Sequence, residues 1–244
     1  IFPEAPETPV DRAKVQALRT EWAGWANYQS AEAAPAIVDD LLRHMLEEGW
    51  AEAYDSLEQA QAALGSSHLV GVKLALVSKE RPDGSMKHRL VWDFLRSGVN
   101  ELVRQGERVV LPRLTDVVRD AQNLAELDPE AEWALELIAD IADAFHQVPL
   151  NSEERRFALV EHNGRVYAFK VLVFGSKSAP TVWGRLAAFL GRTWAAVCDR
   201  RRLRVQIYVD DPHFSLRGPP RDIAIEVALA FLWAAVLGYP LAWA

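Results

Sequence analysis

Three pairs of strand-like segments, each joined by a short turn, alternate with helical segments along the second part of the chain. The pairs span residues 72–94, 156–174 and 204–216, and Pro, Asp, Asn or Gly marks their turns. A strand that returns at once through a short turn pairs antiparallel with its neighbour, because parallel pairing needs a long crossover. The pattern therefore predicts an α+β fold with a mostly antiparallel sheet.

Helical periodicity fills the stretches between these pairs. The predicted helices span residues 11–28, 36–50, 56–64, 111–127, 179–201 and 223–238. A further strand is predicted over residues 133–141, where an apolar run contains Asp140 near its end. Residues 1–10 hold three prolines and are expected to be extended.

The composition narrows the class of protein. Half of the residues are apolar, which is enough for a substantial core, and Cys198 is the single cysteine. One cysteine excludes an internal disulfide and a zinc site built on cysteines, so a reducing, intracellular compartment is expected. No run of about 18 apolar residues is present, so we expect a soluble protein without a membrane partner. The chain starts at Ile1 rather than Met, and we expect it to be part of a longer polypeptide.

The charge is distributed unevenly. The formal net charge is -7, which argues mildly against a nucleic-acid partner. Residues 1–70 carry 12 acidic and 4 basic side chains, whereas residues 71–244 carry 22 and 23. The cluster DRRRLR at residues 199–204 is either a solvated loop or a phosphate contact, and the charge alone does not decide between them.

Two predicted strand ends carry carboxylates. Asp140, with Asp143 close behind it, ends one strand, and Asp210 and Asp211 occupy the turn of the last strand pair. Adjacent aspartates fit an ordinary solvated turn. They also fit a metal site, because a hard cation such as Mg²⁺ binds carboxylate oxygens and offsets their repulsion. If the two strands are neighbours, the carboxylates converge at one edge of the sheet.

Five stretches, taken together in this order and spacing, resemble the polymerase motifs of retroelement reverse transcriptases, including those of retrotransposons. They are KHRLVWDFLRSGVN (87–100), LPR (111–113), LIADIADAFHQVPL (137–150), FGSKSAP (174–180) and YVDD (208–211). The resemblance covers residues 36–244 and stops before the thumb. It implies an N-terminal extension or linker over residues 1–35, a fingers-like part over 36–130 and a palm-like part over 131–244. The palm would be an antiparallel sheet with helices on one face.

The resemblance implies roles for particular residues. Asp140, Asp210 and Asp211 would be catalytic and would bind metal, with the backbone carbonyl of Ile141 as a further ligand. Phe145 would be the ring that excludes a ribose 2′-OH, although core packing is the alternative for an aromatic residue at this position. The other nucleotide-binding residues would be Lys79, Arg89, Phe174 and Gly175, of which Gly175 could also be a simple turn before a helix.

The implied function is RNA-directed DNA polymerisation, a nucleotidyl transfer that uses two Mg²⁺ ions, with Mn²⁺ as a substitute. The implied partners are an RNA or DNA template with its primer, a dNTP, and the remainder of a polyprotein, which supplies a thumb and an RNase H in some arrangements. Because the thumb is absent, the chain alone is expected to be weak or inactive. The alternative is a degenerate palm that binds nucleic acid or a protein without catalysis.

Two positions depart from the family pattern. Pro212 follows the aspartate pair, where an aliphatic residue is more usual, and proline has no N–H to donate in a sheet. Ala142 stands where a basic or polar residue is common. Neither change removes a predicted ligand, but the returning strand is expected to pair poorly at Pro212.

Overall fold

The computed structural model describes residues 26–242, so the expected extended segment 1–10 and nearly all of the helix expected over 11–28 lie outside the described part. The chain forms two compact units, and each unit takes more than one stretch of the sequence. The described residues of unit 1 are 107–144 and 180–242, and those of unit 2 are 26–106 and 145–179. Residues 107–130 therefore fold with the strands that carry the carboxylates.

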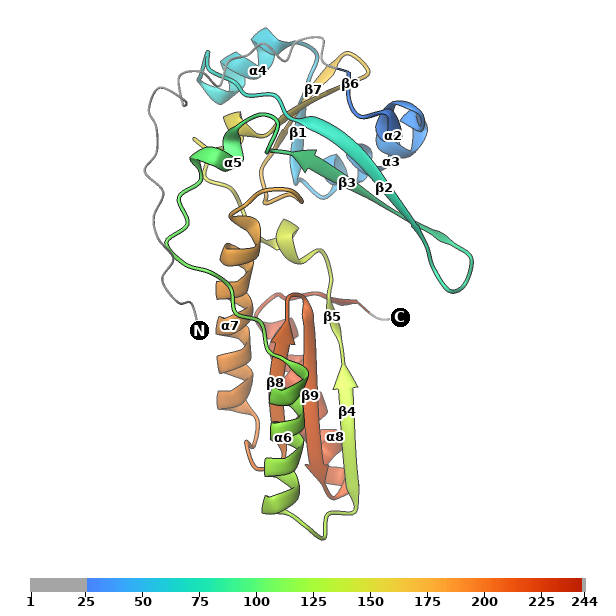
Figure 1. Cartoon of the computed structure of the whole chain (residues 1–244), viewed down its shortest axis with the longest axis vertical. Coiled ribbons are helices and arrows are strands. Elements are labelled where there is room, and N and C mark those ends of the chain that lie inside the picture. Colours follow the sequence, from blue (N-terminus) through green and yellow to red (C-terminus); the bar gives the residue numbers. More distant parts are fainter. Residues whose placement is uncertain (1–25, 243–244) are drawn as a thin grey trace. The chain divides into compact units, whose positions relative to one another are not determined.

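Unit 1 is built on an antiparallel sheet with the strand order β4–β9–β8 (Figure 1). Its elements are α6 (Leu114–Leu127), β4 (Trp133–Ile138), β5 (Asp140–Ile141), α7 (Ala179–Val197), β8 (Leu203–Tyr208), β9 (Asp211–Gly218), α8 (Pro220–Val236) and β10 (Leu241–Ala242). The short strands β5 and β10 pair with each other. All three predicted long helices and the predicted hairpin are present, with ends shifted by a few residues.

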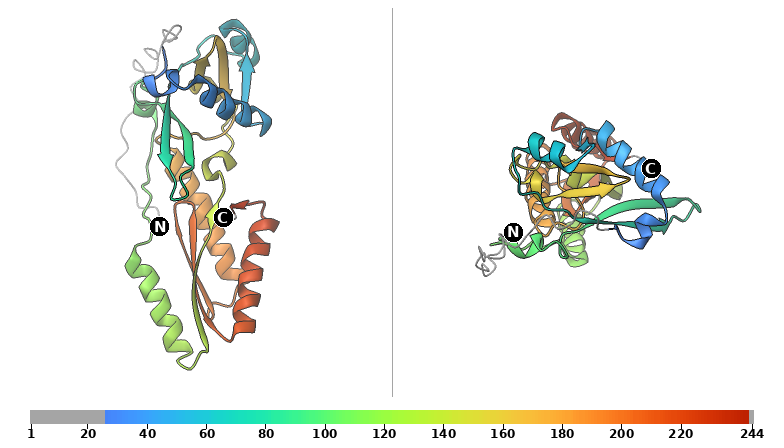
Figure 2. Two further views of the ribbon diagram at one scale, coloured as in Figure 1. Left: turned by 90° about the vertical axis from the view of Figure 1, so that its right-hand side faces the viewer. Right: turned by 90° about the horizontal axis from the view of Figure 1, so that it is seen from above.

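Helices lie against both faces of this sheet, and the left view of Figure 2 shows α6 and α8 on opposite sides of the strands. On one face, the buried indole of Trp194 in α7 donates a hydrogen bond to the Ala230 carbonyl of α8 at 2.7 Å and meets the Phe214 ring of β9 edge-on. On the other face, the Gln206 amide of β8 donates to the Asp120 carboxylate of α6 at 2.6 Å. The α+β class is confirmed, and α6 adds a helix on the second face.

Unit 2 combines a three-stranded sheet, in the order β1–β7–β6, with the separate hairpin β2–β3. Its elements are α2 (Gln29–Glu32), α3 (Pro35–Glu47), β1 (Ala51–Tyr54), α4 (Leu57–Leu64), β2 (Lys73–Glu80), β3 (Met86–Asp93), α5 (Val99–Leu102), β6 (Leu159–His162) and β7 (Arg165–Phe169), with 3₁₀ turns at Ala144–Gln147 and Arg155–Phe157. Both predicted hairpins are confirmed. Asn163 and Gly164 have φ values of 50° and 73°, as a tight type I′ turn requires.

Three elements of unit 2 were not predicted from the sequence, namely β1, α2 and α5. The segment AEAY of β1 has no clear strand composition, and it is extended because residues 51–54 pair with β7. The other two are single helical turns of four residues, too short to leave a periodic pattern. Tertiary pairing rather than local propensity therefore determines these parts of the unit.

The position of Cys198, the single cysteine, predicts a low reactivity toward thiol reagents. Cys198 is buried at the end of α7, and burial, with a smaller contribution from Glu226, raises its pKa to about 12. Because thiolate is the reactive form, the native protein is expected to resist a thiol reagent at pH 8 and to react fully in denaturant. A raised pKa means that the folded state favours the protonated thiol. The contribution of Cys198 to the free energy of unfolding is therefore present below the ordinary thiol pKa of about 8.5 and is lost as the pH rises toward 12. Rapid labelling of the native protein would contradict the buried position.

No helix within residues 26–242 is both long enough and apolar enough to cross a membrane.

Candidate active site

The hairpin β8–β9 turns through only two residues, Val209 and Asp210, because Tyr208 and Asp211 close it as a pair. Val209 has a φ of 59°, in the left-handed region where a β-branched residue is rare. Tight hairpins need a positive φ at the first turn position, so the turn imposes this conformation on valine. The buried Trp183 indole of α7 donates to the Val209 carbonyl at 2.7 Å and holds the turn in place.

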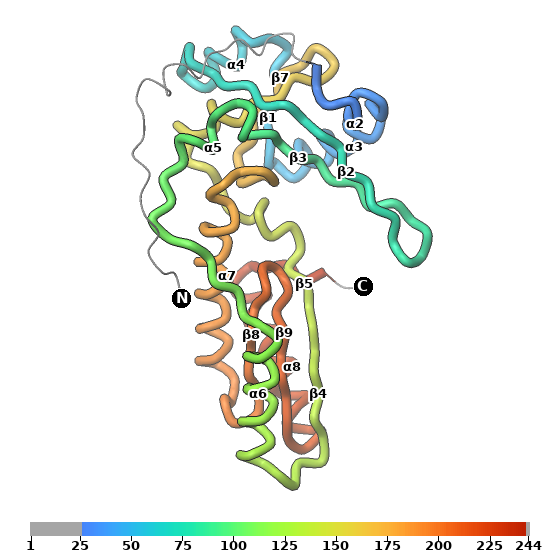
Figure 3. The backbone as a smooth tube through the Cα atoms, viewed as in Figure 1, coloured from blue at the N-terminus to red at the C-terminus, as the bar shows by residue number. Residues whose placement is uncertain are grey.

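The end of β4 lies directly beside this turn, as the backbone in Figure 3 shows. The Ile141 amide donates to the Asp210 carbonyl at 2.8 Å, which places the Asp140 strand end next to the aspartate pair. β10 then pairs with the far side of this segment, since Ala242 lies opposite Asp140 and Leu241 opposite Ile141. The predicted convergence of the two strand ends is therefore present in unit 1.

The carboxylates also interact electrostatically. Partial desolvation at the surface, followed by the negative charges of Asp210 and Asp140, raises the pKa of the Asp211 carboxyl above its ordinary value. Like charges raise a carboxyl pKa only when they lie close by. Asp140 and Asp211 are exposed and Asp210 is half-buried, so all three reach solvent.

These residues fit a divalent cation by their chemistry. Carboxylate oxygens and a backbone carbonyl are hard ligands of the kind that Mg²⁺ takes, and the mutual repulsion at Asp211 is what a cation would relieve. Within residues 26–242, however, no three His, Cys, Asp or Glu side chains are gathered closely enough to form a ready-made metal cage. A cation bound here would therefore have to draw the three carboxylates together.

Pro212 does not disturb the hairpin. The Pro212 carbonyl accepts from the Ala139 amide at 3.0 Å, so the backbone edge of this residue faces the end of β4 and not β8. Opposite Pro212, Ile207 keeps the register of β8, and Tyr208 and Asp211 still close the turn. The missing N–H costs one ladder bond just beyond the last residue of β4, so the expectation of poor pairing in the hairpin is wrong.

A second group of predicted residues lies in unit 2. The rings of Phe145 and Phe174 lie 5.2 Å apart, and the Arg89 guanidinium lies 5.7 Å from the centre of the Phe174 ring. Both rings are half-buried, so each keeps one part exposed. The structure therefore brings Arg89, Phe145 and Phe174 together, with Gly175 next in the chain.

In the half nearer its turn, the hairpin β2–β3 carries three cations on one face. Lys79 lies opposite Lys87, and Arg89 lies opposite Val77 in the same register. Side chains at alternate positions point to one face of a strand, so Lys79, Lys87 and Arg89 share a face. Lys87 was not singled out from the sequence, although its spacing of two from Arg89 could have revealed it.

The loop after Phe174 is fixed by close contacts with β3. A Cβ atom at Gly175 would lie 2.0 Å from the Trp92 carbonyl oxygen, and the φ of 103° already requires glycine. The Asn100 amide donates to the Gly175 carbonyl at 2.9 Å, and its oxygen accepts from the Lys177 amide at 2.8 Å. Sequence reasoning gave Asn100 no role, although it is the last residue of the motif at 87–100.

The hydrogen bond from Trp183 is expected to stabilise the turn formed by Val209 and Asp210, called here the aspartate turn. Trp183→Phe keeps an aromatic ring but removes the N–H donor, so the carbonyl left unpaired is expected to cost about 1–3 kcal/mol, to which the lost indole volume adds. Amide exchange at Val209 and Asp210, measured by NMR, is expected to speed up. Trp194→Phe is the matched control, since it removes an equivalent bond to Ala230 and should leave exchange at the turn unchanged. Equal exchange at the turn in both variants would contradict the role of Trp183.

The sequence of the chain matches a known protein family. The family model described as reverse transcriptase (RNA-dependent DNA polymerase) matches residues 93–243, more than half of the chain. The chain therefore belongs to the reverse transcriptase family. A search of curated proteins found no match.

Solved structures give the same fold. A prototype foamy virus protease–reverse transcriptase (a CSH mutant) matches with a TM-score of 0.57 and 18% identity, over 98% of this chain and 25% of its own. A foamy viral protease–reverse transcriptase dRH in complex with double-stranded DNA matches with a TM-score of 0.58 and 15% identity, over 99% of this chain and 33% of its own. The chain thus spans a quarter to a third of the length of these proteins.

Proposed function

We propose that the chain is the nucleotidyl-transfer domain of an RNA-directed DNA polymerase. The observation that carries this proposal is the convergence of Asp140, Asp210 and Asp211 at one end of the unit 1 sheet, in a chain of the reverse transcriptase family. Asp140 and Asp210, with the Ile141 carbonyl, would bind two divalent cations, and Asp211 would support them. The cations, Mg²⁺ or Mn²⁺, would supply charge stabilisation for the attacking and leaving oxygens.

The remaining predicted residues would bind the incoming dNTP. Lys79 and Arg89 would contact its phosphates, since arginine binds phosphate through two parallel hydrogen bonds. Phe145 would lie against the sugar, and the partial exposure of its ring supports a position at a pocket rather than wholly inside the core. Gly175 would let the backbone approach the base.

We further propose that residues 36–130 act as the fingers-like part and residues 131–244 as the palm-like part, with residues 1–35 as an extension. The compact units divide the chain differently, since residues 107–130 fold with unit 1 and residues 145–179 with unit 2. The partners would be an RNA or DNA template with its primer, and the rest of the parent polyprotein. The relative solved with double-stranded DNA supports a nucleic-acid partner. The cationic face of the β2–β3 hairpin supports it as well, because most of the affinity for nucleic acid comes from neutralised phosphates.

The second candidate is a palm that binds nucleic acid or a protein without catalysis. One observation favours it: among residues 26–242, no three His, Cys, Asp or Glu side chains form a ready-made metal cage. It differs from the first candidate in its metal dependence, because binding without catalysis does not need a divalent cation.

Primer extension on an RNA template tests the proposal. The chain would be assayed as it stands and in its parent polypeptide, with Mg²⁺ and either dNTPs or rNTPs. We expect DNA synthesis from dNTPs, little from rNTPs because of Phe145, and weaker activity from the chain alone. If both preparations are folded and neither makes product with Mg²⁺ or Mn²⁺, the binding-only candidate takes the place of the polymerase.

A further inference from the structure

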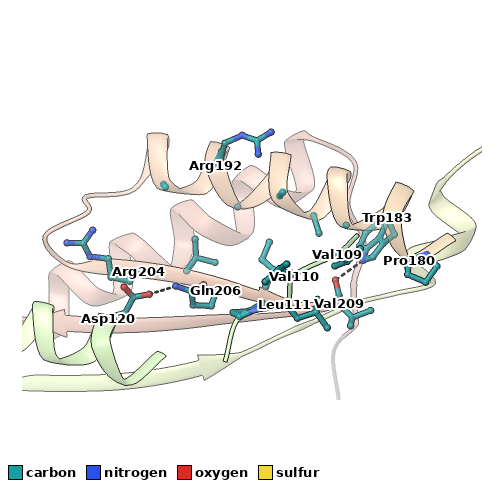
Figure 4. A pocket seen from close by; sticks show the side chains of 18 of the residues that line it. Val109, Val110, Leu111, Asp120, Pro180, Trp183, Arg192, Arg204, Gln206 and Val209 are labelled. Carbon is teal, nitrogen blue, oxygen red and sulfur yellow. Dashed lines mark hydrogen bonds between the residues drawn. The ribbon is translucent and has the colours of Figure 1, made fainter. Parts of the chain in front are cut away.

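A cavity of about 510 Å³ lies in unit 1 along the outer edge of β8 (Figure 4). Its walls are β8, the inner side of α7 and the segment Val109–Pro112. The volume falls within the range of about 300–1,000 Å³ that is typical of ligand sites. None of the predicted metal-binding or nucleotide-binding residues lines it.

The edge of β8 in this cavity has unused backbone hydrogen-bonding groups. β8 is the outer strand of the sheet, and the Arg217 amide of β9 donates to the Arg202 carbonyl at 2.9 Å. Bonded pairs alternate along an antiparallel ladder, so the groups of Val205 and Ile207 point away from β9. Among the described residues, no other backbone group bonds to these two residues across the edge.

The same cavity carries surplus positive charge. Arg192, Arg200 and Arg204 line it, and none of them forms an ion pair with another described residue. The single acidic side chain in its wall, Asp120, already accepts from the Gln206 amide, as Figure 4 shows beside Arg204.

Arg204 adds a more specific sign of a missing partner. Its Nε atom is buried and has no hydrogen-bond acceptor among residues 26–242. A buried donor without an acceptor costs about 1–3 kcal/mol and is uncommon in folded proteins. An acidic group entering the cavity would supply the acceptor.

We propose that this cavity binds an extended, acidic segment of another polypeptide, which adds a strand to the edge of β8. A strand edge offers N–H donors and C=O acceptors in alternation, and a second strand satisfies both. A phosphate or a fatty carboxylate has no donors for the Val205 and Ile207 carbonyls, so the edge favours a peptide. The arginines then select acidic side chains.

The wall formed by α7 leaves room for such a strand. Four of its residues on the cavity are small and recur at helical spacing, namely Gly184, Ala187, Ala188 and Gly191. Gly191 already lets the Ile207 side chain approach, since an added Cβ would lie 3.3 Å from it. Apolar side chains at alternate positions of the bound strand would pack against this wall, while the acidic ones would point to the opposite face of the sheet, where Arg204 lies beside Gln206.

Peptide binding to the folded full chain, measured by fluorescence anisotropy, tests this proposal. The probe is a labelled, end-blocked hexapeptide that alternates Glu and Val, and its controls are the same peptide with Lys for Glu and one with N-methylated backbone at alternate residues. We expect saturable binding of the acidic peptide alone, because the first control reverses the charge and the second removes edge donors. Equal binding of all three peptides, or of none, would overturn the proposal.

Two variants locate the binding site. Arg204→Met is expected to weaken the acidic peptide about tenfold or more, the value of one charge-assisted hydrogen bond. Arg221→Met makes the same charge change at an exposed position of unit 1 outside the cavity and is expected to bind as the wild type does. Arg200→Met replaces the first variant if Arg204→Met fails to fold. Similar losses of affinity in the cavity variant (Arg204→Met or Arg200→Met) and in Arg221→Met would show that only net charge matters. That result would contradict a binding site in the cavity.

Sedimentation of the same samples shows whether the cavity is occupied by a second copy of the chain or by a different polypeptide. We expect a monomer whose cavity is open to the peptide. A wild-type dimer that dissociates in Arg204→Met and excludes the peptide would assign the edge to a second copy and overturn the assignment to another polypeptide. The inference does not rest on polymerase activity, so an inactive chain would leave this test unaffected.

Discussion

Gly175→Ala is expected to destabilise unit 2 by about 2–5 kcal/mol. The left-handed backbone of Gly175 costs an alanine about 1–2 kcal/mol, and overpacking typically adds about 1–3 kcal/mol. Overpacking is unavoidable because the new Cβ would lie 2.0 Å from the Trp92 carbonyl oxygen, which belongs to a strand and cannot move freely. Urea unfolding of the variant and the wild type measures the difference.

Gly84→Ala is the matched control for this prediction. Gly84 lies in unit 2 with a φ of 81°, and nothing lies within 4 Å of its Cβ position. It therefore carries the backbone strain without the clash, and it is expected to cost only about 1–2 kcal/mol. Equal losses in both variants would show that the contact with Trp92 does not constrain the loop.

Asp210→Asn is expected to lower the rate of RNA-templated primer extension about 10²–10³-fold, the size of losing one charge-stabilising group from a preorganised site. The substitution keeps the shape of the side chain and removes the charge that would hold a cation. Affinity for the primer–template, measured in parallel without dNTP, is expected to change little. The parent polypeptide serves for this assay, because the chain alone is expected to be weak.

Asp143→Asn is the control for the charge change. Asp143 follows the same strand end but lies outside the proposed ligand set, and its φ of 51° is one that Asn adopts readily. We expect its rate to stay within a few-fold of the wild type. A full rate in Asp210→Asn, or an equal loss in Asp143→Asn, would contradict the proposed ligands.

The carboxylate end of unit 1 was predictable because its signals are local. Strand, turn and helix patterns located β4, α7, β8, β9 and α8, and the resemblance indicated that the two strand ends meet. The sequence could not show how the aspartate turn is held, because the bond from Trp183 to Val209 joins residues 26 positions apart. The effect of Pro212 was misjudged because its backbone direction depends on register, and only the pairing with Ala139 fixes it.

Unit 2 was less predictable, since its key contacts are between distant segments. Asn100 and Gly175 are 75 positions apart, and nothing in the local sequence of either indicates their bond. Lys87 illustrates the opposite case, because strand alternation alone places it on the face of Arg89. Asn100 and Lys87 are therefore two further residues whose substitution would test the proposed nucleotide pocket.

Asp140, Asp210 and Asp211 are proposed to form a divalent-cation site, and iron-directed cleavage tests this proposal most directly. Fe²⁺ would be bound in place of Mg²⁺, radical cleavage of the backbone would be started with ascorbate and peroxide, and mass spectrometry would locate the cuts. The account predicts cuts beside residues 140–141 and 209–211, which excess Mg²⁺ suppresses and Asp210→Asn abolishes. Cuts elsewhere, or cuts at these positions that persist unchanged in Asp210→Asn, would contradict it.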